Sequence, residues 1–174
     1  MQAILVFFAA AFALTAAPGC SPPPEPKTRR LSGLDELFER DELVIVANDG
    51  SRHTFDVYLA LDVDQQRRGL MFVRNLPQQT GMLFVYDDEA IHSMWMKNTY
   101  ISLDLVFARS DGTVSSVIRD TQPRSLRSLS AIEPVSFVLE LNAGVTRRFN
   151  IGVGSQLIWE PKPGQSTAAI ESAR

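Results

Sequence analysis

Short apolar segments rich in β-branched residues, separated by turn signals, are the feature that most constrains the fold. Turns are indicated at Asn48-Asp49-Gly50 and Ser110-Asp111-Gly112, and the acidic run 87–89 is a third candidate. The segments between turns predict strands over 43–46, 53–61, 82–86, 91–97, 103–108, 114–118, 135–141 and 156–159. Strands this short at this spacing predict a mostly β fold, a small single-domain sandwich or barrel.

One or two short helices are expected beside the strands. The stretch Leu34–Arg40 is a first candidate, and a second runs from a capping Asp62 or Asp64 through Arg68 to a terminating Gly69. The strand 53–61 alternates apolar and polar residues, which is typical of a half-buried strand.

The N-terminus has the pattern of an export signal. Residues 3–17 are apolar except for Thr15, and a helix of that length is too short to cross a bilayer. Gly19-Cys20 follows and is similar to a bacterial lipoprotein attachment site. The alternative is an ordinary signal peptidase cut that leaves Cys20 unmodified. The prediction is a signal peptide over 1–19 and an exported, periplasmic lipoprotein anchored through Cys20.

Two further segments fall outside the predicted domain. Residues 20–30 contain a proline-rich run that excludes helix and sheet and suits a tether. The predicted β-rich domain covers 31–160, and 161–174 is expected to be a flexible tail.

Composition excludes several classes of function. The net charge is -3, which argues against a nucleic-acid partner. With one Cys and two His, the chain cannot supply four Cys or His ligands to a structural zinc ion. No Gly-x-Ser-x-Gly pattern of a hydrolase nucleophile is present. No cofactor is predicted.

The centre of the chain carries distinctive blocks. They are Arg68-Gly69-Leu70-Met71, Gly81-Met82-Leu83-Phe84, Trp95-Met96-Lys97-Asn98-Thr99, Leu103-Asp104 and Val138-Leu139-Glu140-Leu141. In this order they resemble the family catalogued as domain of unknown function 192, over about residues 43–159. The resemblance implies a compact β-rich fold, commonly in an exported or membrane-associated protein, and no established reaction.

Lys97, Asn98 and Asp104 form the first candidate site. Asp104 interrupts an apolar strand, where a carboxylate is unfavourable unless it is paired, hydrogen-bonded or exposed. Lys97 could meet it across a turn, and the three side chains would then orient a polar ligand. Arg68 and Trp95 are counted with this ligand-binding site. The alternative interpretation is a structural ion pair beside a turn.

A soft-metal site is the second candidate. His92, Met94 and Met96 alternate and would share one face of a strand, and thioether plus imidazole ligands suit Cu(I) or Ag(I). The simpler interpretation is that the methionines fill the core.

Paired carboxylates are the third candidate. Asp104, Glu140, Asp56 and the cluster Asp87-Asp88-Glu89 could supply acid–base groups, and strand alternation predicts that Glu140 points outward. The leading prediction is a non-catalytic module that binds a small molecule or an envelope protein. The alternatives are a hydrolase that uses Asp104 and Lys97, and a Cu(I) or Ag(I) carrier.

Overall fold

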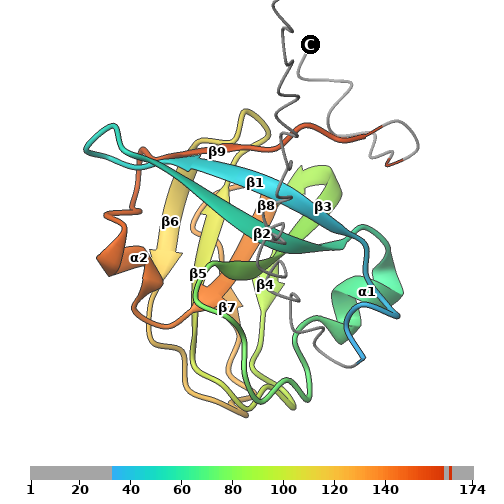
Figure 1. Cartoon of the computed structure of the whole chain (residues 1–174). Coiled ribbons are helices and arrows are strands. Elements are labelled where there is room, and N and C mark those ends of the chain that lie inside the picture. Colours follow the sequence, from blue (N-terminus) through green and yellow to red (C-terminus); the bar gives the residue numbers. More distant parts are fainter. Residues whose placement is uncertain (1–32, 163–164, 166–174) are drawn as a thin grey trace, which may run out of the picture.

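The computed structural model describes residues 33–162 and 165, and these fold around one strongly curled sheet (Figure 1). The leader, the tether and most of the predicted tail lie outside the described residues. Two parts of the predicted tail are described: Lys162 forms an ion pair with Asp41, and Gln165 donates to Glu39. The described part of the chain contains no helix long and apolar enough to cross a membrane.

Seven strands make the main sheet, in the spatial order β6-β5-β8-β3-β2-β1-β9. Their bounds are β1 Arg40–Val46, β2 Arg52–Ala60, β3 Thr80–Ala90, β5 Leu103–Ala108, β6 Val114–Ile118, β8 Val135–Asn142 and β9 Gln156–Ile158. Among the described strands only β2 and β3 pair in parallel, and the connection between them contains helix α1, Val63–Arg68. A second, two-stranded sheet pairs β4, Ser93–Met94, with β7, Leu129–Ser130.

The sheet curls until its edge strands meet. Thr113 and Gln156 form an isolated bridge between the start of β6 and β9, and the Leu157 N–H donates to the Gly112 carbonyl at 2.9 Å. The result is a partly closed barrel. The prediction of a mostly β sandwich or barrel with short helices is therefore confirmed.

Two core clusters lie on opposite faces of the sheet. The inner cluster takes residues from both edges, including Leu43, Val114 and Leu157, so it fills the barrel interior. The outer cluster covers the central strands and includes Phe84, Met96 and Leu105. Because β3, β5 and β8 are covered on both sides, their apolar runs are nearly continuous.

Several predicted elements are confirmed. Strands 103–108 and 114–118 have the predicted bounds, and 43–46 lies within β1. Helix α1 begins at the N-cap Asp62, whose carboxylate accepts from the Gln65 N–H at 2.8 Å, and it ends at Gly69. The second helix, α2, is a single turn at Val145–Arg148.

Three local predictions are wrong. Residues 34–40 form no helix: one turn places Leu34 and Phe38 in the outer cluster, and Arg40 already begins β1. The acidic run 87–89 lies within β3, whose pairing with β8 shifts register between Val85 and Ala90. Of the predicted strand 91–97, only Ser93–Met94 is a strand, because it pairs with the two residues of β7.

Candidate functional site: a pocket over the buried Glu140

The structure does not bring Asp104 to Lys97. Asp104 lies between Leu103 and Leu105, which face the outer cluster, so its own side chain points to the opposite face. It is 0% exposed, and no ion pair joins it to Lys97 within the described residues. The predicted contact between Lys97 and Asp104 is therefore wrong: the two side chains lie on opposite sides of the sheet.

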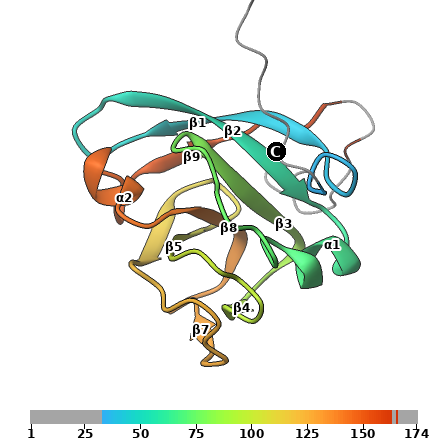
Figure 2. The same ribbon diagram turned by 60° about the horizontal axis from the view of Figure 1, so that its bottom comes forward.

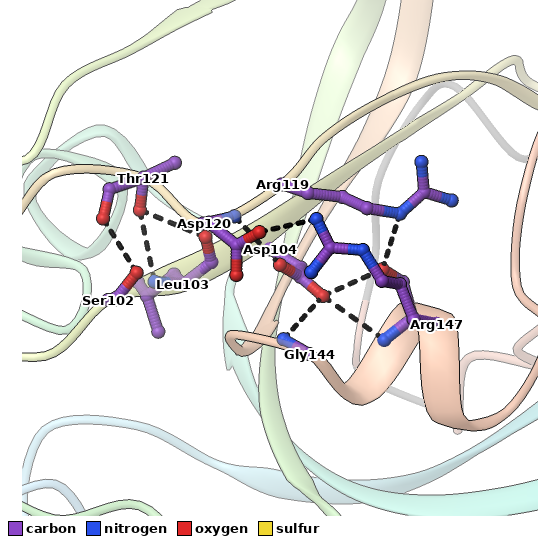
Figure 3. Close-up of polar contacts among 9 residues, drawn as sticks. Ser102, Leu103, Asp104, Arg119, Asp120, Thr121, Gly144 and Arg147 are labelled. Atoms are coloured by element: carbon purple, nitrogen blue, oxygen red, sulfur yellow. Dashed lines mark hydrogen bonds and ion pairs between the residues drawn. The ribbon is translucent and has the colours of Figure 1, made fainter.

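Asp104 instead holds the β5–β6–α2 corner together (Figure 3). Its Oδ1 accepts from the Asp120 N–H at 3.0 Å, and its Oδ2 accepts from the Gly144 and Thr146 N–H groups at 3.0 and 3.1 Å. The Thr146 hydroxyl also donates to Oδ2, at 2.7 Å. Both oxygens are satisfied, so the burial of this carboxylate is explained by structure alone.

Asn98 also has a structural position. Its backbone adopts a left-handed φ of 56°, which asparagine tolerates better than most residues, and its carbonyl accepts from the Phe72 N–H at 2.8 Å. Its side-chain amide contacts the Met71 sulfur at 3.9 Å. Asn98 therefore joins two loops rather than lining a cavity.

The other predicted ligand residues, Arg68, Trp95 and Lys97, do come together. They line one small pocket beside the outer cluster, and the full lining is Gln66, Arg67, Arg68, Gly69, Leu70, Met71, Phe84, Met94, Trp95, Lys97, Thr99 and Glu140. Most of these residues belong to the sequence blocks described above. The pocket volume is about 20 Å³, which is room for about one water-sized group.

Glu140 is the unusual member of this lining. It is 4% exposed, its β-ladder partners are Met82 and Leu105, and its Oε2 has neither a hydrogen bond nor contact with solvent among the described residues. Burial raises the pKa of Glu140 to about 8. At neutral pH the carboxyl is therefore mostly protonated and carries an O–H donor.

Cations and an aromatic ring surround the opening. The Lys97 ammonium lies 4.9 Å from the Trp95 ring centre, and the Arg68 guanidinium lies 5.0 Å from that of Phe72. Arg68 also donates to the Met71 carbonyl, which fixes its direction. Donors and positive charge converge here, so the pocket suits an anionic or hydrogen-bond-accepting end group.

Sequence reasoning placed Glu140 on the outside, and this prediction is wrong. Strand β8 lies between β5 and β3 and is buried on both faces, so the side chains on neither face of this strand reach solvent. The available signal was the uninterrupted apolar character of 135–141, which is typical of a central strand.

The proposed soft-metal ligands do not lie on one strand, because β4 contains only Met94 of the three. Met94 and Met96 are both buried in the outer cluster, and Met94 accepts from the Tyr86 hydroxyl at 3.6 Å. His92 stacks on Tyr86 with ring centres 3.5 Å apart. Only Met94 of the three lines the pocket. Within residues 33–162, no group of three His, Cys, Asp or Glu residues could hold a metal ion.

A larger cavity of about 230 Å³ opens near the β6–β9 contact, lined by Phe137, Leu157 and Trp159 among others. Two of its polar lining residues already have partners: Gln156 donates to the Asp111 carbonyl, and Ser110 donates to Glu89. Most of the other lining residues are apolar, and the lining contains no Lys or Arg. The smaller pocket has the chemistry of a binding site, so we take it as the candidate.

By its fold, this protein is a partly closed β-barrel. Its candidate site is a small pocket whose lining includes the buried Glu140 and the cations Arg68 and Lys97. Residues 44–159 match the family described as "Uncharacterized ACR", domain of unknown function 192, and the chain belongs to this family. The resemblance found in the sequence is thereby confirmed. No curated protein matches the chain.

Two solved structures are similar. One is a candidate transcription regulator from Sinorhizobium meliloti, with 36% identity, a TM-score of 0.68, and coverage of 70% of this chain and 94% of the other. The second is a protein of unknown function from Novosphingobium aromaticivorans, with 31% identity, a TM-score of 0.68, and coverage of 83% and 94%.

Proposed function

We propose that this protein is a non-catalytic binding module of the bacterial envelope that holds the anionic end group of a small molecule in the Glu140 pocket. The observation that carries the proposal is a buried carboxyl oxygen without a partner, in a pocket lined by Arg68 and Lys97. A buried polar group of this kind is unfavourable unless a ligand or water satisfies it.

The pocket volume limits what enters. About 20 Å³ has room for one oxygen of a carboxylate or a phosphate and excludes a whole organic ligand. The remainder of the ligand would lie outside, against Trp95, which is half exposed. The ligand class is therefore a carboxylate or phosphate ester with an apolar or planar body.

A titration with acetate and with inorganic phosphate tests this site. We expect ¹H–¹⁵N chemical-shift changes at the Trp95 indole and the Thr99 amide. Lys97→Ala should weaken binding by about tenfold or more, since a charge-assisted hydrogen bond contributes about 1.5–3 kcal/mol. Lys162→Ala is the matched control, because it removes the same charge far along the chain, beside Asp41.

Glu140 variants make the same test more specific. Glu140→Gln keeps a donor and should retain binding, while Glu140→Leu should lose it. An absence of shifts near the pocket, or equal effects of the two lysine variants, would overturn the proposal.

Export and lipid attachment are part of the proposal, supported by the apolar stretch 3–17, the Gly19-Cys20 pair and the proline-rich segment that follows. Labelled palmitate should be incorporated in bacteria and lost in Cys20→Ser. A wild-type chain without label, recovered in the periplasmic fraction, would instead indicate ordinary export.

A hydrolase and a copper carrier are less well supported. Asp104 is committed to four hydrogen bonds, and Met96 lies in the core. The transcription role named for the Sinorhizobium protein is not carried over, because the chain has a net charge of -3.

A further inference from the structure

Three loops gather at the end of the molecule that carries β4 and β7 (Figures 1 and 2). They cover residues 70–79, 91–101 and 121–132, and we call their outer side the three-loop surface. Backbone hydrogen bonds join them: Phe72 donates to the Asn98 carbonyl at 2.8 Å, Met96 to Ser125 at 3.0 Å, and Arg124 to Thr99 at 3.0 Å. The surface is therefore one continuous structure.

Large hydrophobic side chains are concentrated on this surface. Leu126 is 70% exposed, Ile132 is 76% exposed and Trp95 is 48% exposed. Phe72, Ile91 and Tyr100 are exposed as well. Exposed apolar side chains that gather on one face mark an interaction site.

The charge of the same surface is positive. The three loops contain no Asp or Glu, although the whole chain has a net charge of -3. Their cations are Arg74, Lys97, Arg124 and Arg127, and none of these has a carboxylate within 4.0 Å in the described chain. Two instead lie over aromatic rings: Arg74 over Tyr100 at 4.7 Å and Lys97 over Trp95 at 4.9 Å.

We infer that the three-loop surface docks on the headgroup region of an anionic lipid bilayer. Trp and Tyr beside Arg and Lys suit the membrane–water interface, and basic residues near an anionic surface each contribute to binding. Leu126 and Ile132 would enter the acyl boundary. A nucleic-acid partner would match the charge but would leave these exposed aliphatic side chains without a role.

Vesicle co-sedimentation tests the inference. The leaderless chain, residues 21–174, is suitable because it contains all the strands and both core clusters that the structure describes. It should bind vesicles of phosphatidylcholine mixed with phosphatidylglycerol, and bind phosphatidylcholine alone only weakly. Added salt should release it. A blue shift of tryptophan emission should accompany binding and be lost in Trp95→Phe.

Matched variants make the result specific. Arg124→Gln with Arg127→Gln should weaken binding about 25-fold, or about fivefold per charge. Leu126→Ser should weaken it about tenfold. The controls are Arg52→Gln with Arg148→Gln, and Val153→Ser, which are exposed residues outside the three loops. Equal losses in variants and controls, or binding to a DNA duplex and not to vesicles, would overturn the inference.

A variant of the Glu140 pocket distinguishes a failure of this inference from a failure of the proposed function. Glu140→Leu should abolish acetate binding and leave vesicle binding unchanged. Vesicle binding that fails while acetate still shifts the Trp95 indole would reject the docking surface alone.

Discussion

Two buried carboxylates show how the setting of a single residue determines its role. Asp104 accepts four hydrogen bonds, which satisfy both of its oxygens and hold α2 against β5. Glu140 receives no hydrogen bond from the described residues, and burial raises its pKa to about 8. The first carboxylate serves the fold, and the second has an oxygen that no described residue satisfies.

Neighbouring Tyr86 responds to the same environment. Burial raises the pKa of its phenol, and the charge that Glu140 and Asp88 can carry raises it further. Its hydroxyl remains protonated and donates to the Met94 sulfur at 3.6 Å. Burial therefore favours the protonated form of both Tyr86 and Glu140.

The sequence predicted some residues of the candidate site correctly and others wrongly. Arg68, Trp95 and Lys97 were recognised, and the structure places them together at one pocket. Asp104 was recognised as anomalous, but the backbone N–H groups that satisfy it lie 16 to 42 positions away in the chain. Glu140 was misplaced, because burial on both faces of β8 depends on which strands flank it.

At the scale of elements, the sequence predicted correctly the features that neighbouring residues determine, namely hairpin turns and a helix cap. Hairpins at Asn48-Asp49-Gly50 and Ser110-Asp111-Gly112, and the Asp62 cap, follow from neighbouring residues. The β3 extension through 87–89 and the two-residue β4 depend on partners far along the chain, namely β8 and β7. No local pattern specifies these long-range pairings.

The contact between β6 and β9 is an element-scale feature that depends on a single residue, Gly112. Gly112 has a φ of +81°, and a Cβ there would lie 2.2 Å from the Leu157 carbonyl oxygen. Gly112→Ala should therefore lower the free energy of unfolding by about 3 kcal/mol, from positive-φ strain plus a lost hydrogen bond.

Gly50→Ala is the matched control for this prediction. Its φ is +82°, and nothing lies within 4 Å of the added Cβ, so only the backbone strain of about 1 kcal/mol remains. Urea unfolding of both variants measures the difference. Equal losses would mean that the β6–β9 contact does not stabilise the barrel.

At the scale of the whole molecule, the pocket and the three-loop surface lie at the same end. Trp95 and Lys97 belong to both, so a ligand in the pocket would be next to a docked membrane. A lipid anchor at Cys20 would place this end within reach of a bilayer, since 13 residues from 20 to 32 extend over at most roughly 45 Å. The proposed export, pocket and docking surface are thus mutually compatible.

The central claim is that Glu140 is buried and neutral, and unfolding measured as a function of pH tests it most directly. A carboxyl with its pKa raised from 4.5 to about 8 binds a proton in the folded state that the unfolded state releases. Its stabilising effect is full below pH 4.5 and is lost as pH rises to about 8. The slope contributed is about 1.4 kcal/mol per pH unit.

Glu140→Gln removes this titration and keeps the shape and the donor. The free energy of unfolding of the wild type should therefore fall, relative to Glu140→Gln, as pH rises from 4.5 to about 8, with the two curves parallel outside that window. Curves that stay parallel throughout the window would show that Glu140 is ionised or solvated in the folded protein, and would contradict the proposed binding site.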